Sequence, residues 1–425
     1  MSLTIFLLLL VGFMAVGMPI ALAMIASSVL YALMNGIDLG FFTIQMYASL
    51  NNFILLAIPF FLLASEIMER TSISQRMFRF ANSVVGFVPG GLGHVNVVAN
   101  IIFSGMSGSA VADAGGIGRI CYKAMVDAGY DESFSKSVTA GAAVIGPIIP
   151  PSIPMVVYAM VANVSVAKLF FGGVVPGLLL GLALMIYIFF VSKARRYPVS
   201  SHFDLREMLA SLFQGILPLL TPLILLGSIY YGIVTVTEAA AVAVLYSSFL
   251  GIFAYRLLTF QKFYDSLKSV YTICGPILLL IIGAKVFGFV LTTEGVSQNL
   301  ATSILEFTKN PLIILILINL VFMVAGCLSD PLVNIMIFVP LFLPLVSLSG
   351  LNPIHFGVMI VLNCMVGLIT PPVGALLVIV NSFGKPNVSS LLKEIWPVII
   401  IEFLVLILVI MVPSTVLWVA GLMSR

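Results

Sequence analysis

Charged residues are what this chain of 425 residues has least of. Only 8% of its residues are Asp, Glu, Lys or Arg, and 61% are hydrophobic, with a mean hydropathy of +1.22. Soluble globular domains carry roughly 25% charged residues, so this chain cannot cover itself with a water-facing surface. The formal net charge of +3 is small, and no basic patch alternates with aromatic residues. These features exclude a soluble enzyme and predict no nucleic acid partner.

Several chemical motifs are also missing. No HExxH sequence, paired carboxylates or nucleophile–base pattern occurs, which predicts that the chain is not an enzyme, and the GxxxxGK[ST] nucleotide loop is absent too. The four cysteines lack a CxxC spacing and are interpreted as small buried residues: Cys121, Cys274, Cys327 and Cys364. The first ten residues lack a basic region and an A-x-A site, so we interpret them as part of a retained membrane helix.

Long charge-free runs dominate the chain, the longest of them covering residues 331–384. A bilayer is crossed by roughly 20 apolar residues in a helix, so the sequence predicts an all-α polytopic membrane protein. Basic loops stay in the cytoplasm, and this rule predicts an inside N-terminus and an outside C-terminus. The nine predicted spans are 3–34 with a kink at 17–19, 53–68, 138–163, 170–192, 214–234, 237–254, 270–291, 355–380 and 398–422.

A small, glycine-rich segment, residues 103–118, interrupts the apolar pattern. Bare backbone in hydrocarbon is costly unless protein or a water-filled cavity satisfies it. The apolar run before Ser104 is too short to span, so we expect one arm of a re-entrant hairpin. A broken helix follows, with the sequence GPIIPP at 146–151.

The same features recur at one offset later in the chain. Gly326 follows Gly105 by 326 − 105 = 221 residues, and Gly367 follows Gly146 by the same number. The Pro pairs 150–151 and 371–372 also differ by 221. The charge pattern places the two hairpins on opposite sides, so the halves are predicted to be inverted. Inverted repeats with paired interrupted helices point to a secondary-transporter binding site at the midplane.

Broken helices suggest which groups bind. Half-helix N-termini favour anions, whereas unwound carbonyls and helix C-termini coordinate Na⁺. The predicted Na⁺ ligands, mostly through main-chain oxygens, are Ser104, Ser107, Gly146, Ile149, Pro151, Gly326, Gly367, Thr370 and Val373. The predicted substrate contacts are Ser107, Ser109, Asp330, Thr370 and Pro371. Na⁺ is the only cofactor that we predict.

Several residues keep two interpretations. Asp330, the only charge in 310–384, is either a substrate or ion contact or a helix cap, and Asp113 is left equally open. Glu238 completes an S/T-x-x-E capping box with Thr235, or acts as a functional carboxylate. Lys285 either snorkels or pairs with an anion. The remaining cases are a solvated or anion-steering role for Arg119 and Lys123, and a structural role for His94 and His355.

Four motifs resemble those of the large membrane subunit of TRAP (tripartite ATP-independent periplasmic) transporters. They are FSGMSGSAVAD at 103–113, GPIIPPSIP at 146–154, TEAAAV at 237–242 and GLITPPVG at 367–374, and the similarity runs over essentially the whole chain. The resemblance implies Na⁺-coupled uptake of an organic anion across the bacterial inner membrane by an elevator mechanism. It also implies a small four-helix membrane subunit and a periplasmic substrate-binding protein as partners, besides membrane lipid and the anion.

Among the carboxylates that the family transports, the sequence ADAGGIG at 112–118 resembles that of the members for sialic acid and other sugar acids. The alternative is a stand-alone Na⁺/dicarboxylate symporter that needs no binding protein; a channel is a further rival. We predict scaffold helices at 1–85, repeat-1 transport elements at 86–165, scaffold and connecting helices at 166–270, repeat-2 transport elements at 271–385, and a C-terminal scaffold helix at 386–425.

Overall fold

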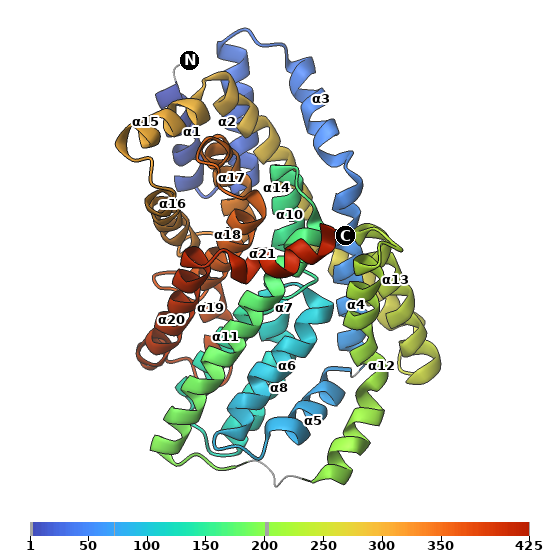
Figure 1. Cartoon of the computed structure of the whole chain (residues 1–425). Coiled ribbons are helices and arrows are strands. Elements are labelled where there is room, and N and C mark those ends of the chain that lie inside the picture. Colours follow the sequence, from blue (N-terminus) through green and yellow to red (C-terminus); the bar gives the residue numbers. More distant parts are fainter. Residues whose placement is uncertain (1–2, 72, 200–203, 425) are drawn as a thin grey trace.

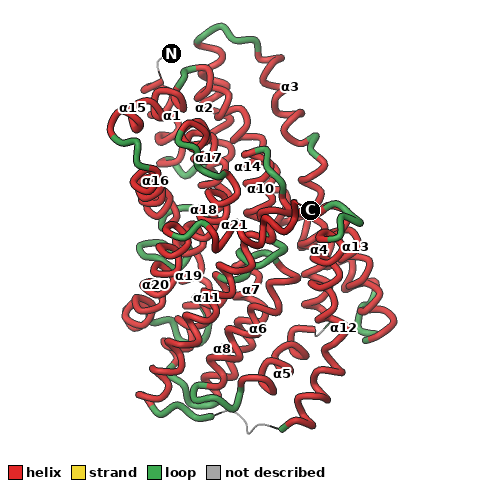
Figure 2. Tube along the Cα trace, in the orientation of Figure 1, coloured by secondary structure: helices red, strands yellow, loops and turns green. Residues whose placement is uncertain are grey.

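The computed structural model of the chain (Figure 1) describes residues 3–71, 73–199 and 204–424, and within these ranges it contains helices and no strand (Figure 2). Six helices of this described part are long and apolar enough to cross a membrane, and a seventh crossing results if the pair Leu39–Leu50 and Phe53–Arg70, bent by 51°, is counted as one. The predicted class of polytopic helical membrane protein is confirmed.

The first half of the chain ends with the long helix α11. Its elements are α1 (Leu3–Ala15), α2 (Ile20–Met34), α3 (Leu39–Leu50), η1 (Phe53–Leu56), α4 (Ala57–Arg70), α5 (Ile73–Val85), α6 (Gly91–Ser107), α7 (Ala110–Asp113), the π-helical turn η2 (Ala114–Gly118), α8 (Arg119–Asp127), α9 (Glu132–Val144), α10 (Ile153–Ala162) and α11 (Val166–Arg195).

The second half contains the hairpin formed by α16 and α17 and the second broken helix, α18 and α19. Its elements are α12 (Leu205–Tyr230), α13 (Val236–Phe249), the π-helical turn η3 (Leu250–Ala254), α14 (Phe260–Thr293), α15 (Val296–Phe307), α16 (Pro311–Gly326), α17 (Pro331–Leu348), α18 (Pro353–Gly367), α19 (Ala375–Asn381), α20 (Val388–Met411), α21 (Ser414–Gly421) and η4 (Leu422–Ser424).

The 221-residue offset extends from the motifs to the helix boundaries. It carries Glu132, the first residue of α9, onto Pro353, the first residue of α18. It also carries the return arm of the first hairpin, 110–127, onto α17, 331–348. Figure 1 places α6 and α8 in the lower half of the molecule and α16 and α17 in the upper half, an arrangement consistent with inverted copies.

The first predicted span is wrong. Residues 3–34 were expected to form one kinked crossing, but they form the two short helices α1 and α2, with Gly17 at a φ of 91° between them. The chain folds back there and places α1 against α2. The ring of Phe6 packs edge-on against Tyr31, with ring centroids 5.6 Å apart. Figure 1 places the start of α1 at the end of the molecule opposite the C-terminal end of α11. The predicted inside N-terminus therefore does not hold if the basic loop after α11 is cytoplasmic.

The last predicted span is wrong in a similar way. Residues 398–422 were expected to cross as one helix, yet α20 ends at Met411 and Pro413 precedes α21. Figure 1 shows α21 lying across the long axis of the molecule, where it packs against α11. The count of nine spans therefore fails at both ends of the chain.

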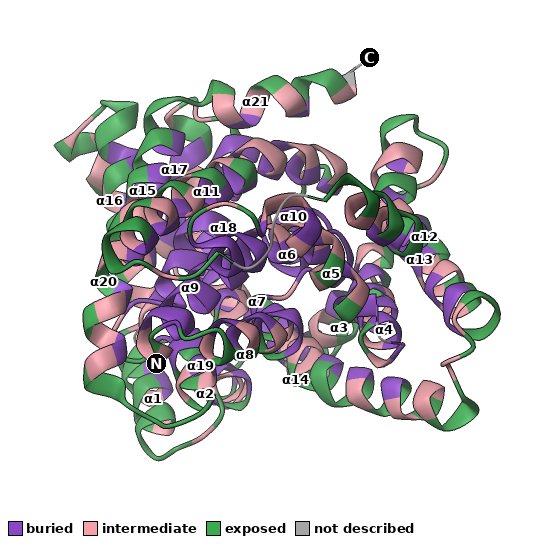
Figure 3. Cartoon of the chain, turned by 90° about the horizontal axis from the view of Figure 1, so that it is seen from below, coloured by how far each residue is buried: buried purple, intermediate pink, exposed green. Residues whose placement is uncertain are grey.

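The broken helices form the core. Residues 354–367 of α18 and 134–144 of α9 are all buried, and Figure 3 shows them near the middle of the molecule. α20 packs against both α9 and α18, while α11 packs against α6 and α18. At the periphery, Thr235 and Glu238 form the capping box at the start of α13, with Thr235 N donating to Glu238 Oε2 at 2.7 Å. The capping interpretation of Glu238 is confirmed.

Candidate functional site

The tip of the first hairpin rests on the break of the first broken helix. α6 ends at Ser107, and Gly108 takes the left-handed conformation with φ 66°. A Cβ on Gly108 would lie 2.6 Å from the carbonyl oxygen of Pro151, and the carbonyl of Gly108 accepts a hydrogen bond from Ile153 N at 3.4 Å. Only glycine fits such a close approach of two backbones, so Gly108 allows the tip to contact the break.

The first break covers residues 145–152, between α9 and α10. Its far end is capped by Ser152, whose Oγ accepts from Met155 N at 3.2 Å and donates to the carbonyl of Pro147. The bond between Pro150 and Pro151 is cis. The break therefore presents a half-helix N-terminus at α10 and the C-terminal carbonyls of α9, the two kinds of group that bind an anion and a cation.

Asp113 belongs to this first site, although the sequence left its role open. It is fully buried, and its Oδ1 accepts a hydrogen bond from Ser107 Oγ. Its Oδ2 has no hydrogen-bond partner among the described residues. A Cβ on Gly146 would overlap that oxygen, so glycine at 146 leaves room for the carboxylate beside the break. A buried carboxylate oxygen without a partner suits a cation ligand.

The tip of the second hairpin meets the second broken helix at a pair of glycines. α16 ends at Gly326 and α18 ends at Gly367. A Cβ on Gly367 would lie 2.7 Å from Gly326 Cα, and a Cβ on Gly326 would lie 3.3 Å from Gly367 Cα. The following residues 368–374 are unwound before α19, and Thr370 Oγ1 donates to Val366 O at 2.8 Å. Each hairpin tip thus meets the broken helix of its own half.

Asp330 caps a helix. Its Oδ1 accepts a hydrogen bond from Leu332 N at 2.8 Å, which makes it the N-cap of α17. Its neighbour Ser329 bonds Asn334 Oδ1 at 2.5 Å, within the same tip. The capping interpretation therefore describes the structure, and the second oxygen of this carboxylate is left for another contact.

Other predicted ligands differ in accessibility. Ser104 is buried and its Oγ donates to Ile101 O at 2.6 Å, within α6. Ile149 and Thr370 are buried, whereas Val373 is 50% exposed. Ser109 is half-buried and caps α7, its Oγ accepting from Ala112 N at 3.4 Å. Ser107, Ser109, Gly146 and Pro151 lie together at the first tip and break, while Gly326, Gly367 and Thr370 lie at the second.

Sequence reasoning missed a polar pair behind each site. Asn96 on α6 donates to Thr139 Oγ1 on α9 at 2.8 Å, and Asn363 on α18 donates to Asn319 Oδ1 on α16 at 2.8 Å. All four side chains are buried. Polar residues in apolar helices cross-link neighbouring helices, and Asn in otherwise apolar runs was the signal that could have located them. Each pair joins a hairpin arm to its broken helix.

The remaining residues of interest have structural surroundings. His355 Nε2 bonds to Val409 O at 2.8 Å and His94 Nε2 to Pro89 O at 3.2 Å. All four cysteines are free, three of them buried. No group of three or more His, Cys, Asp or Glu side chains that could hold a metal occurs in the described ranges.

The two broken helices contact each other reciprocally: α10 reaches the start of α18, and the chain after α19 reaches the start of α9. Tyr158 on α10 donates to Pro353 O at 2.7 Å, and a Cβ on Gly357 of α18 would overlap its ring. In the reciprocal contact, the chain after α19 reaches the start of α9, where Lys385 N donates to Glu132 Oε1 at 2.8 Å. α10 also packs on α18 and α19 on α9. The two broken helices are therefore held together by mutual contacts of the two halves.

Comparisons with known proteins agree with this architecture. The family model described as "Tripartite ATP-independent periplasmic transporter, DctM component" matches residues 7–415. The chain is 41% identical to the sialic acid TRAP transporter large permease protein SiaM of Vibrio cholerae over 404 residues, covering 95% of each chain. It is 38% identical to the C4-dicarboxylate TRAP transporter large permease protein DctM of Pseudomonas aeruginosa, covering 87% of each.

A solved structure has a similar fold. The YdaH transporter of Alcanivorax borkumensis, described as having an unusual topology, superposes with a TM-score of 0.67 over 88% of this chain and 87% of that one. The two sequences are only 13% identical, so this similarity concerns the fold and not the transported molecule.

Proposed function

We propose, from the premise that this chain belongs to the TRAP transporter family as its large, DctM-type permease, that it carries out Na⁺-coupled uptake of an organic anion. The relatives are named as transporter permeases, not enzymes, and the chain is a multi-pass protein of the bacterial inner membrane. The coupling ion, the anion and the mechanism of movement are the proposal.

The observation that carries the proposal is the pair of tip-and-break contacts, Gly108 against Pro151 and Gly326 against Gly367. Each contact brings a hairpin tip and a helix break to one place inside the buried core. Hard carbonyl and hydroxyl oxygens suit a hard cation such as Na⁺. In the first site the cation would contact Ser107, Gly146, Ile149 and Pro151, with the free oxygen of Asp113 as an added ligand. In the second it would contact Gly326, Gly367, Thr370 and Val373.

The anion would lie between the two sites. The N-termini of α10 and α17 carry partial positive charge, and bound Na⁺ would add to it. The proposed contacts are Ser107, Ser109, Asp330, Thr370 and Pro371. With the hairpins and broken helices braced against each other, we propose that they move as one body in an elevator step against the other helices.

Sialic acid or another sugar acid is the proposed substrate. The relative at 41% identity is named for sialic acid, whereas the relatives at 38% and 36% are named for C4-dicarboxylates. The proposed partners are a small four-helix membrane subunit and a periplasmic substrate-binding protein, with membrane lipid around the complex.

The test is uptake into liposomes that contain the permease with its small subunit, with the binding protein added outside. We expect uptake of sialic acid that requires a Na⁺ gradient and the binding protein. Uptake that continues when K⁺ replaces Na⁺ contradicts the coupling. Uptake of succinate at full rate without the binding protein supports the alternative, a stand-alone Na⁺/dicarboxylate symporter.

A further inference from the structure

Lys136 is a buried cation in the middle of a contact between the two halves. It lies on α9 and its side chain is 2% exposed. Lysine is almost never buried without a partner, and here Nζ lies 2.8 Å from Glu132 Oε1 and donates to the carbonyl of Lys385 at 2.7 Å. The lysine of the first half is therefore satisfied partly by backbone of the second half.

The same ion pair also binds the other backbone group of Lys385. Its N–H donates to Glu132 Oε1 at 2.8 Å, and Tyr122 on α8 donates to that oxygen at 3.1 Å. Gly384 makes the approach possible, since it has a φ of 61° and a Cβ there would lie 2.5 Å from Glu132 Oε1. Glu132 and Lys136, one helical turn apart, thus bind the N–H and the carbonyl of Lys385, respectively. We call Glu132, Lys136 and the backbone of Lys385 the peptide clamp.

The peptide clamp lies one short helix away from the second break. α19 has only seven residues, with the left-handed Gly374 of the break before it and the clamp after it. Phe383, between α19 and the clamp, packs on Tyr122 with ring centroids 5.4 Å apart. A helix of two turns transmits a displacement of one end to the other, so the position of the clamp bears on residues 368–374.

We propose that the Glu132–Lys136 ion pair is a positioning element for the second helix break. It fixes the far end of α19 to the first half and thereby sets the geometry of the unwound residues 368–374. Its consequence for ion affinity rests on the proposed function, in which that break binds Na⁺. Glu132 and Lys136 do not touch the break, so their effect on it passes through α19.

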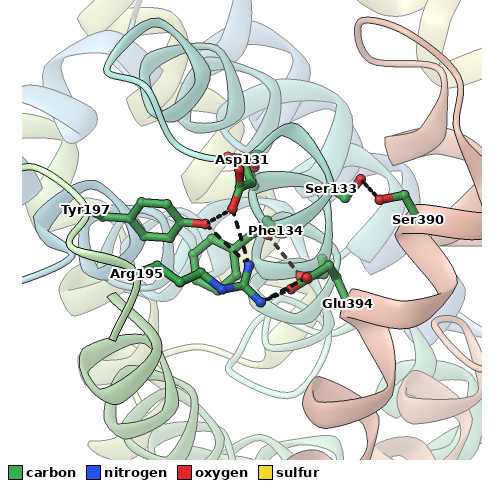
Figure 4. Close-up of polar contacts among 9 residues, drawn as sticks. Asp131, Ser133, Phe134, Arg195, Tyr197, Ser390 and Glu394 are labelled. Atoms are coloured by element: carbon green, nitrogen blue, oxygen red, sulfur yellow. Dashed lines mark hydrogen bonds and ion pairs between the residues drawn. The ribbon is translucent and has the colours of Figure 1, made fainter. Parts of the chain in front are cut away.

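A second polar cluster at the same end of α9 provides a matched control. In Figure 4, Arg195 of α11 bridges Asp131 and Glu394, with Nη2 at 2.9 Å from Glu394 Oε1, and Ser133 bonds Ser390. These contacts join α9 to α11 and α20, but they do not bind Lys385. Arg195→Gln therefore removes an interhelical ion pair of similar location without touching the peptide clamp.

The first experiment measures hydrogen–deuterium exchange of the backbone amides of 373–383 in the purified permease without Na⁺. We expect Lys136→Met to speed exchange there by about tenfold, within the range typical of coupling between sites. Lys136→Arg, which keeps a cationic donor, should restore slow exchange, and Arg195→Gln should resemble the wild type. Wild-type exchange in Lys136→Met overturns the proposal.

A charge-reversed double variant, E132K/K136E, distinguishes the hydrogen bonds to Lys385 from the ion pair itself as the cause of the effect. The reversal keeps an acid and a base on α9 but places a cation beside Lys385 N–H and an anion beside its carbonyl. The clamp predicts fast exchange in 373–383 in this variant, whereas slow exchange would show that the ion pair alone matters and would overturn the proposal. Size-exclusion chromatography selects variants that remain folded; Lys136→Gln, which keeps a neutral donor, replaces Lys136→Met if that protein does not fold.

The second measurement is the Na⁺ concentration that gives half-maximal uptake in liposomes. We expect Lys136→Met to raise it about tenfold, again a typical size for coupling between sites, with a smaller change in the half-saturating anion concentration. An unchanged Na⁺ requirement despite faster exchange refutes the ion-affinity consequence. If the wild type needs no Na⁺, the proposed function fails, while the exchange data still decide whether the clamp positions the break.

Discussion

Gly326 and Gly367 pack against each other through their backbones, and residue 367 has no room for a side chain toward Gly326. The Cβ of an alanine at 367 would lie 2.7 Å from both Cα and C of Gly326. These two residues end α16 and α18, so the contact joins the point where the hairpin turns to the point where the core helix unwinds.

Gly367→Ala should therefore displace the second tip. The atoms it would meet are backbone atoms, which cannot rotate away, and overpacking of this kind costs about 1–3 kcal/mol. We expect uptake to fall strongly while the protein stays in the membrane. Gly288→Ala in α14 is the control, because no atom lies within 4 Å of its Cβ and alanine favours a helix interior. Equal uptake by both variants would show that the glycine contact is dispensable.

Asp330 can be tested by separating its charge from its cap. Asparagine caps a helix about as well as aspartate, whereas alanine costs about 0.5–2 kcal/mol. If the carboxylate contacts an ion or the substrate, both Asp330→Asn and Asp330→Ala lose uptake, which is our expectation. Uptake at the wild-type rate in Asp330→Asn, together with a loss in Asp330→Ala, would mean that the residue only caps α17. Thermal unfolding of each variant in detergent reports the loss of the cap separately.

Glu402 lies buried on α20 with both carboxyl oxygens free of hydrogen-bond partners among the described residues. A Cβ on Gly141 of α9 would lie 3.0 Å from Glu402 Oε1, so glycine makes space for the carboxyl between the helices. An unpaired buried charge is costly, and we therefore expect the neutral amide in Glu402→Gln to preserve both folding and uptake. Loss of uptake in Glu402→Gln but not in Glu402→Asp would instead show that the carboxyl ionises during transport.

The peptide clamp should respond to acid. The hydrogen bond from Lys136 is the largest cause that lowers the pKa of Glu132 below its ordinary value of 4.5. A lowered folded-state pKa adds stability above the unfolded pKa, and this stability is lost as the pH falls through the folded pKa. The wild type should unfold at a higher temperature than Glu132→Gln near neutral pH, and the difference should vanish well below pH 4.5. A difference in unfolding temperature that persists at that low pH would mean that packing, and not the charge of Glu132, causes it.

The sequence was most informative where the chain departs from regular helix. The glycines and proline pairs at 146–151 and 367–372 located both breaks, and their common offset indicated the repeat. The S/T-x-x-E pattern located the start of α13. Each of these signals is local, because glycine, proline and capping residues act on the backbone within one turn.

The contacts that the sequence could not show are long-range. The fold-back of α1 on α2 depends on Phe6 meeting Tyr31, and hydropathy alone does not separate a kink from a turn at Gly17. Asn319 and Asn363 are 44 residues apart, and nothing in their neighbours indicates that they pair. The sequence does not decide the role of Asp113, because that role depends on the space that Gly146 leaves for its carboxylate. This contact joins two segments, and hydrophobic periodicity carries no information about it.

The reciprocal contacts of the broken helices bear on how the chain is made. Lys136 donates to the carbonyl of Lys385, which is synthesised 249 residues later, and Tyr158 donates to the carbonyl of Pro353, 195 residues later. A growing polypeptide leaves the ribosome N-terminus first, so α9 and α10 are made long before these two carbonyls exist. During that interval Glu132 is the remaining partner of the Lys136 ammonium, whereas the Tyr158 hydroxyl still lacks the acceptor that it has in the finished fold. The first half of the chain therefore completes its hydrogen bonds only after α18 and the chain after α19 have been synthesised.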